Sequence, residues 1–192
     1  MNRIVLATGN LHKLREVRSA LSGLDGFATD AQPTAIVGAE ETGVTFMENA
    51  VLKAVHVSRL VDDLVLADDS GLCVDALDGR PGVLSARYAD GDAARIQRIL
   101  SEMSAVPDGR RTAAFVCALA LAQRGSVIWQ GEGQVDGTID RVASGSNGFG
   151  YDPIFRVPEY NRTMAELTAV QKDQTSHRGR ALVRLMNFLR QR

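Results

Sequence analysis

The sequence predicts a single α/β domain, and two kinds of pattern lead to this expectation. Short apolar runs, such as Ile4–Ala7 and Leu64–Ala67, are typical of buried strands. Between such runs lie segments whose apolar residues recur every three or four positions, as they do on one face of an amphipathic helix. Strands and helices that alternate in this way pack as helices against a sheet. The sequence contains no repeat and no linker, so we expect residues 1–192 to form one domain around a twisted sheet.

The apolar spacing predicts four helices. The first begins near residue 11 and follows the turn Thr8-Gly9-Asn10 directly. The second begins at Thr45-Phe46-Met47-Glu48, which matches a capping box. A third helix is expected over residues 96–103, and a fourth near the C-terminus, with Ser176 as its cap.

The remaining strands and turns follow from apolar runs and glycine. We expect the strand at Leu64–Ala67 to stop abruptly at the acidic tetrapeptide Asp68-Asp69-Ser70-Gly71. Further strands are predicted at residues 72–77, 112–121, 127–129 and 137–139. Asp78–Gly82 reads as a turn, and Ser144–Gly150 as a glycine-rich loop.

The composition excludes several classes of protein. With 45% apolar and 23% charged residues the chain can bury a core, and it is not a disordered segment. A formal net charge of -1 gives no positive field for nucleic acid or an anionic membrane, although a small polyanion needs only a local group of cations. Cys73 and Cys117 lie in apolar runs without metal-ligand spacing, so we expect core residues in a reducing compartment. The first apolar run is too short for a signal peptide, and no stretch of about 18 apolar residues is present, so we expect a cytoplasmic protein.

The turn Thr8-Gly9-Asn10 and Lys13 form the first candidate site. A strand that enters a glycine turn and a helix offers free backbone N–H groups and the positive end of the helix dipole, which suit a phosphate. Lys13 opposes the dipole of its own helix, and a bound anion would reverse that penalty. The alternative is an ordinary turn with a surface lysine.

The acidic pair Asp68-Asp69 forms the second candidate site. Adjacent carboxylates at the end of an apolar strand repel each other and lose solvation, and a divalent cation such as Mg²⁺ compensates for both effects. Glu40-Glu41 supplies a second acidic pair, and Lys53 is able to reach a phosphate. The alternatives are a solvated acidic turn, acids that favour a helix start, and a surface lysine.

Two further segments suggest a base-binding site. The glycine loop leads into Phe149-Gly150-Tyr151-Asp152, where an aromatic ring can stack on a base and a carboxylate can accept from base N–H groups. The alternative is a hairpin loop whose aromatic residues cover the core. Lys172 and the pair His177-Arg178 place cationic groups near the start of the last helix, which implies an anion or a carbonyl-bearing ligand.

With these residues in view, the chain resembles the inosine/xanthosine triphosphate pyrophosphatase family over nearly its whole length. The blocks that carry the resemblance are Ala7-Thr8-Gly9-Asn10-x-x-Lys13-x-x-Glu16, Glu41-Thr42-Gly43-x-Thr45-Phe46-x-Glu48-Asn49-Ala50-x-x-Lys53-Ala54, Ala67-Asp68-Asp69-Ser70-Gly71-Leu72, Gly82-x-x-Ser85-Ala86-Arg87-Tyr88, Gly148-Phe149-Gly150-Tyr151-Asp152-Pro153-Ile154-Phe155, Ala165-Glu166-Leu167 and Ser176-His177-Arg178-Gly179.

The resemblance implies a homodimer in which two lobes flank a long central mixed sheet, with the nucleotide in the cleft between the lobes. It implies Asp69 as the proton acceptor for the attacking water. It also implies that Asp69, Glu41 and Asp68 hold Mg²⁺. Carried over by position, the substrate-binding residues are Thr8, Gly9, Asn10, Lys13, Lys53, Ser70, Phe149, Gly150, Tyr151, Asp152, Lys172, His177 and Arg178.

The leading hypothesis is therefore Mg²⁺-dependent hydrolysis of ITP, dITP and XTP at the α-phosphorus, which yields a nucleoside monophosphate and pyrophosphate and cleanses the nucleotide pool. The alternatives are a pyrophosphatase with another base preference, such as modified pyrimidines, and a nucleotide sensor without turnover. The sequence has no Arg-Glu-x-x-Glu-Glu helix of a Nudix hydrolase, and its aspartates are adjacent rather than in the Asp-x-Asp order of an aspartyl phosphatase.

Overall fold

The computed structural model describes residues 2–191, which form seven strands in one mixed sheet of order β2-β1-β3-β4-β5-β6-β7. β1 runs parallel to β2 and to β3, whereas β6 runs antiparallel to β5 and to β7. The strands are β1 (Asn2–Leu6), β2 (Phe27–Ala31), β3 (Leu64–Val74), β4 (Thr112–Gln123), β5 (Ser126–Ile139), β6 (Phe155–Val157) and β7 (Arg162–Thr163). The α-helices are α1 (Leu11–Leu21), α2 (Phe46–Ser58), α3 (Asp92–Glu102), α4 (Ala169–Thr175) and α5 (His177–Leu189).

The chain groups into two compact units. Of the described residues, unit 1 contains 2–69, 117–133 and 177–191, and unit 2 contains 70–116 and 134–176. The predicted α/β class with a long mixed sheet is confirmed. None of the helices in the described part of the chain is long and apolar enough to cross a membrane.

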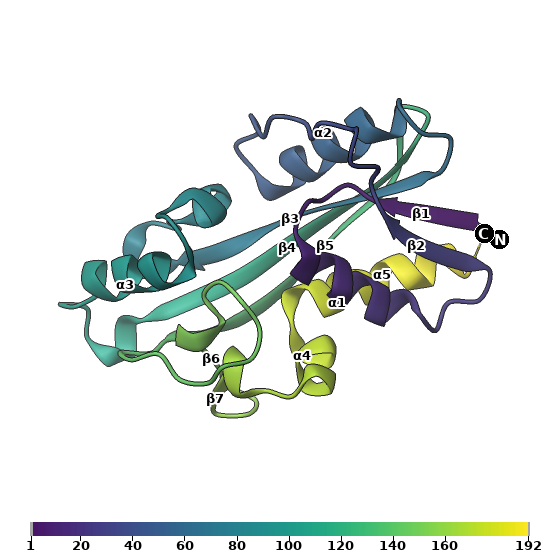
Figure 1. Ribbon diagram of the computed structural model, residues 1–192. Helices are drawn as coiled ribbons and strands as arrows, with labels where there is room; N and C mark the ends of the chain where they lie inside the picture. Colours follow the sequence, from purple (N-terminus) through teal and green to yellow (C-terminus); the bar gives the residue numbers. More distant parts are fainter. Residues whose placement is uncertain (1, 192) are drawn as a thin grey trace. The chain divides into compact units, whose positions relative to one another are not determined.

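In unit 1 the strands form a middle layer with helices on both faces. Both faces are apolar, because side chains along a strand alternate between the two faces. Ile4, Leu66 and Leu119 pack with the apolar faces of α1 and α5 in one buried cluster. Their sequence neighbours point the other way, so Val65 and Ala118 pack against α2 in a second cluster. Figure 1 shows α2 on one side of β1 and β3, and α1 and α5 on the other.

β3 does not end at the acidic tetrapeptide, so that part of the sequence-based prediction is wrong. The strand continues from Leu64 to Val74, and Asp68 and Asp69 lie inside it, both buried. By the alternation of the strand, Asp68 shares the α1 and α5 face with Leu66, and Asp69 shares the α2 face with Val65. Buried carboxylates are tolerated within a strand where cations pair with them, and each of these two has such partners.

Unit 2 has a core of its own. Leu72 and Val74 of β3 pack there with Phe115, Phe155 and other apolar side chains between residues 77 and 167. The rings of Phe115 and Phe155 are tilted against each other, with centroids 4.5 Å apart. Ser85 is fixed beside this core, because its Oγ accepts the N–H of Leu72 at 2.9 Å and donates to the carbonyl of Gly82 at 2.6 Å.

Most of the predicted helices and strands are present, with changes at their ends. The start of α1 and the capping box of α2 are confirmed, and α5 begins directly after Ser176. The segments predicted separately at residues 127–129 and 137–139 belong to one strand, β5. Residues 75–77 form a 3₁₀ helix rather than a strand. β2, β6, β7 and α4 were not predicted, because they are short and lack a clear apolar period.

Gly133 of β5 allows the start of α5 to lie directly on unit 1 of the sheet. A Cβ at this position would lie 2.2 Å from the carbonyl oxygen of His177 and 2.5 Å from the backbone nitrogen of Ala181. Backbone atoms at such distances cannot move aside as a flexible side chain can, so only glycine fits. This close approach places the first turn of α5, with His177 and Arg178, against the strands.

Candidate active site

Asp68 lies at the centre of a buried charged cluster in unit 1. Its Oδ1 accepts from the ammonium group of Lys13, and its Oδ2 accepts from Arg178 Nε at 2.8 Å and from Cys117 Sγ at 3.0 Å. Arg178 also donates to Glu16, which lies on α1 one turn after Lys13. The cluster therefore ties the first turns of α1 and α5 to one carboxylate of β3.

The charges of this cluster stabilise each other. Burial acts to raise the pKa of Asp68, but the guanidinium of Arg178 and the ammonium of Lys13 outweigh it and hold that pKa well below its usual range. Burial would lower the pKa of Arg178, yet Asp68 and Glu16 raise it. The Cys117 thiol is fully buried beside a carboxylate, and both conditions raise its pKa, so it remains a neutral donor.

Asp69 lies on the other face of β3 and has a different set of neighbours. Lys53 Nζ is 3.3 Å from Asp69 Oδ1 and 2.7 Å from Glu41 Oε1, and it also donates to the backbone carbonyl of Asp68 at 2.8 Å. Burial raises the pKa of Asp69, and the charge of Lys53 only partly opposes this. Burial lowers the pKa of Lys53, but Asp69 and Glu41 reverse this and raise it. A carboxylate whose pKa is raised is a stronger proton acceptor than an ordinary aspartate.

The predicted metal ligands are only partly available to an ion in this arrangement. Among residues 2–191, no group of three or more His, Cys, Asp or Glu side chains is placed to hold a metal. Both oxygens of Asp68 are engaged by protein donors, whereas Glu41 and Asp69 converge on the ammonium group of Lys53. Glu41 and Asp69 are therefore the two members of the predicted set that converge on one and the same cation.

The turn before α1 is shaped by its own side chains. Asn10 is the N-cap of α1, where its Oδ1 accepts the N–H groups of His12 at 2.9 Å and Lys13 at 3.3 Å. Thr8 Oγ1 accepts the N–H of Asn10 at 3.1 Å. These contacts fix the orientation of the helix start at the end of β1, with Gly9 and Asn10 exposed. Asn10 thus has a structural role here, and its predicted contact with phosphate stays a prediction.

Unit 2 holds the predicted base-binding residues of the glycine loop. Asp152 Oδ2 accepts the N–H of Phe149 at 2.9 Å and the ammonium group of Lys172 at 2.8 Å. The same ammonium group lies 4.9 Å from the centre of the Phe149 ring. Gly148 and Gly150 adopt positive φ angles of 79° and 62°, so the loop can bend back on Asp152. One aromatic ring, one cation and one carboxylate are therefore brought together.

The remaining predicted site residues have structural partners or lie beside these groups. Tyr151 is buried and donates to the carbonyl of Ser85 at 2.9 Å, and the N–H of Gly150 donates to Asp92 Oδ2 at 2.7 Å. Ser70 follows Asp69 in β3 and is half-buried, and His177 is buried at the start of α5. The structure brings Lys13, Glu41, Lys53, Asp68, Asp69 and Arg178 together in unit 1, and Phe149, Asp152 and Lys172 together in unit 2.

Sequence reasoning assigned no role in the site to Glu16, Asn49 or Cys117. Glu16 follows Lys13 by three positions on α1, so their shared helix face was a usable signal. Asn49 interrupts the apolar stripe of α2, and a polar residue at such a position needs a partner. No signal identified Cys117, because its partner Asp68 is 49 residues away in the chain.

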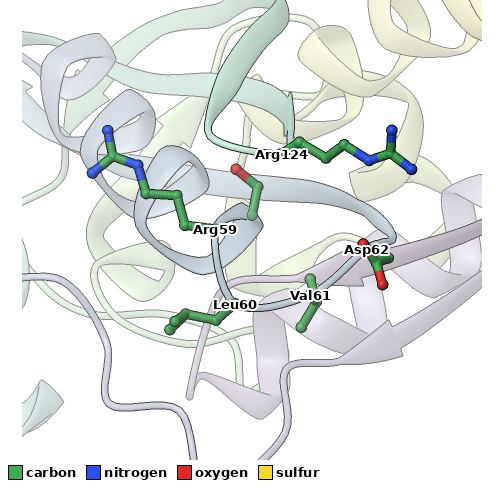
Figure 2. Close-up of a pocket in the computed structure, with 6 residues that line it drawn as sticks. Arg59, Leu60, Val61, Asp62 and Arg124 are labelled. Atoms are coloured by element: carbon green, nitrogen blue, oxygen red, sulfur yellow. The ribbon is translucent and has the colours of Figure 1, made fainter.

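A depression elsewhere in unit 1 does not include any of these residues. It has a volume of about 400 Å³ and is lined by Ser58, Arg59, Leu60, Val61, Asp62 and Arg124. Figure 2 shows that Arg59 and Arg124 extend in opposite directions, so their guanidinium groups do not converge on a common ligand.

Comparison with known proteins gives consistent results. The pattern of the Ham1 family matches residues 4–188. The dITP/XTP pyrophosphatase of Gloeobacter violaceus is 46% identical over 97% of this chain and 94% of its own length. That of Escherichia coli K12 is 46% identical over 99% of each chain. A solved HAM1 protein from Coxiella burnetii has a TM-score of 0.91 and 42% identity, and the match covers all of both chains.

Proposed function

Since this chain belongs to the Ham1 family, we propose that it hydrolyses purine nucleoside triphosphates that carry hypoxanthine or xanthine, namely ITP, dITP and XTP. The bond broken lies at the α-phosphorus, and the products are the nucleoside monophosphate and pyrophosphate. Relatives that are nearly half identical over almost their full length are named dITP/XTP pyrophosphatases, which supports this substrate class.

The observation that carries the proposal is the position of Asp69. It is a buried carboxylate, 6% exposed, with a pKa raised by burial, and it lies beside the cation Lys53 and the acid Glu41. Asp69 takes the proton of the attacking water, and Lys53 moves from the carboxylates to the phosphate charge that develops on the substrate. Lys13 supports the triphosphate in the same way from the first turn of α1.

We propose Mg²⁺ as the cofactor, with Asp69 and Glu41 as its protein ligands. The charged side chains on the two faces of β3, taken together, include more carboxylates than cations. The cations are Lys13, Lys53 and Arg178, and the carboxylates are Glu16, Glu41, Asp68 and Asp69. A polyanionic substrate requires more positive charge than this. Mg²⁺ takes one or two carboxylates and completes its shell with water and phosphate oxygens, which fits a site without three protein ligands. When bound, it neutralises the phosphates and the leaving pyrophosphate.

Base recognition is assigned to the residues of the glycine loop and to Lys172, all of unit 2. Phe149 stacks on the purine, and Lys172 donates to an acceptor such as the 6-oxo group. Adenine carries an amine at this position, so the ammonium donor of Lys172 would face another donor in place of an acceptor. The sequence also predicted His177 and Arg178 of unit 1 for the base edge, and Arg178 is fixed to Asp68.

The protein is proposed to act as a homodimer in the cytoplasm. The free thiols of Cys73 and Cys117 support a reducing compartment. Dimerisation follows from the resemblance noted in the sequence, and analytical ultracentrifugation of the purified protein tests it. A monomer at micromolar concentration would contradict this part of the proposal.

The enzymatic proposal is tested by incubation with ITP, XTP, dITP, GTP, ATP and modified pyrimidine triphosphates, each with Mg²⁺ or with EDTA. We expect pyrophosphate from the first three substrates, and only with Mg²⁺. Release of orthophosphate would exclude attack at the α-phosphorus. Preference for a pyrimidine would change the substrate class, and binding without any product would indicate a sensor.

A further inference from the structure

Two buried polar atoms beside the charged cluster lack a hydrogen-bond partner in the described structure. They are Nδ2 of Asn49 on α2 and Oδ2 of Asp69 on β3. Asn49 is 0% exposed, and Asp69 lies on the strand face that packs against α2. Buried polar groups without partners are rare and costly, and where they occur in a functional region they call for an explanation.

The orientation of the Asn49 amide is fixed by a neighbour. The backbone N–H of Gly43 donates to Asn49 Oδ1 at 2.8 Å, so the oxygen is the acceptor and Nδ2 is the donor that remains. A Cβ on residue 43 would lie 2.7 Å from Asn49 Oδ1 and 2.6 Å from Glu48 Cβ, which explains why glycine is needed here. Glu48 closes the capping box of the same helix start. Asn49 therefore presents a donor whose direction is set by rigid backbone.

That donor acts on Asp69. Burial raises the pKa of Asp69, and the Asn49 amide is among the groups that oppose this rise. In the present conformation the contact between the two side chains falls short of hydrogen-bond geometry. Lys53, which contacts the other oxygen of Asp69 at 3.3 Å, lies four residues after Asn49 on the same face of α2. One helix thus carries both Asn49 and Lys53, whose donors act on the same carboxylate.

We propose that Asn49 is a positioning residue for Asp69: its Nδ2 donates to Asp69 Oδ2 and holds the carboxylate in the rotamer that faces the attacking water. The inference rests on the proposed role of Asp69 as the proton acceptor. A carboxylate oxygen has two acceptor directions, so a bond from Asn49 leaves Asp69 able to receive a proton or to bind a cation. When a catalytic group is displaced by about 1 Å from the reacting atoms, the rate can fall by about 10²-fold.

The test compares the variants Asn49→Asp and Asn49→Ser with the wild type. The first keeps the size of the side chain and the acceptor for Gly43, but it places an acceptor against Asp69. The serine of the second variant is small and uncharged, and it cannot reach Asp69. This variant keeps the test possible if a carboxylate at position 49 prevents folding. We expect kcat with ITP to fall about 10²-fold in both, with KM changed less than about threefold.

Ser58→Ala is the matched control. Ser58 is also buried on α2, and its Oγ accepts the N–H of Gly125 at 3.1 Å, far along the helix from Asp69. It should lower the melting temperature to a similar extent as Asn49→Ser while kcat stays unchanged. Equal kcat losses in the control and the Asn49 variants would mean that Asn49 has a structural role only, and unchanged kcat in the Asn49 variants would also overturn the proposal.

A double variant separates positioning from any independent effect. If Asn49 acts through Asp69, Asn49→Ser in the background of Asp69→Asn lowers the residual rate no further. A further 10²-fold fall in the double variant would contradict the proposal. Failure of the proposed function has a different signature, because the wild-type protein itself would then release no pyrophosphate from ITP.

Discussion

Arg178 Nε donates to Asp68 Oδ2 over 2.8 Å, although the two residues are 110 positions apart in the chain. Both side chains are almost fully buried, and the other end of the guanidinium binds Glu16. A buried pair of this kind is costly to break, because the remaining partner keeps its charge without compensation.

The first prediction is that Arg178→Ala lowers the free energy of unfolding by about 3–5 kcal/mol, since it leaves two carboxylates without their shared cation. Urea unfolding followed by circular dichroism measures this. Arg184→Ala on the exposed face of α5 is the control and should change little. A variant as stable as the wild type but with weakened ITP binding would show that Arg178 serves the base and not the fold.

The second prediction concerns acid stability. The folded-state pKa of Asp68 is depressed, so its stabilising effect is present above the unfolded-state pKa of about 4 and is lost as the pH falls below that value. The free energy of unfolding, measured between pH 7 and pH 2.5, should therefore fall more steeply in the wild type than in Asp68→Asn. Parallel curves for the two proteins would contradict a depressed pKa.

The third prediction is that Asp69→Asn lowers kcat with ITP by about 10²–10⁴-fold, because the amide cannot accept a proton from water. The melting temperature should not fall. Burial raises the pKa of Asp69, so the folded state disfavours its charge above the unfolded-state pKa, and a neutral amide removes that cost. Pyrophosphate release and thermal unfolding, measured on one preparation, check both parts. Retained turnover would exclude the role of Asp69 as base.

The fourth prediction is that Lys13→Ala lowers kcat/KM for ITP by about 10²–10³-fold, since it removes a cation placed for the triphosphate. Arg15→Ala, on the same helix with an exposed side chain, is the control and should stay within about twofold of the wild type. Similar losses in both variants would indicate a general effect of charge on α1 rather than a phosphate contact by Lys13.

The fifth prediction concerns the base. Lys172→Met removes the ion pair with Asp152 and the contact with the Phe149 ring, while it keeps an apolar stem. The ratio of kcat/KM for ITP to that for ATP should fall about 10-fold to 100-fold, the worth of one charge-assisted hydrogen bond. If both substrates lose activity equally, Lys172 does not distinguish the 6-oxo group from an amine.

The periodic parts of the fold were predictable from the sequence, and so was much of the candidate site. The apolar spacing after Asn10 and the capping box at Thr45 gave correct helix starts, because both signals are local. The acidic pair was identified because adjacent carboxylates beside an apolar run need compensation, and Lys13 because a cation at a helix start implies a bound anion. Lys53 was identified because it can reach a phosphate.

The partners themselves were not predictable. The strand was expected to end at Asp68, because two adjacent carboxylates do not favour a buried strand. The cations that stabilise them come from α1, α2 and α5, and local sequence carries no information on such contacts. For the same reason, the sequence did not predict that Asp68 pairs with Lys13 and Arg178 while Asp69 pairs with Lys53. That difference depends on the two faces of β3.

The placement of neighbouring aspartates on opposite faces of β3 restricts which changes in chain length the protein tolerates. A single residue inserted or deleted within Leu64–Ala67 would exchange the two faces, because side chains alternate with a period of two. A deletion would place Asp69 where Asp68 lies, beside Arg178 and Lys13, whereas an insertion would place Asp68 where Asp69 lies, beside Lys53. Either change made before Leu66 would also move that residue out of its cluster. Insertions and deletions that preserve activity should therefore fall in the loops that flank β3, and this start of the strand should keep its length.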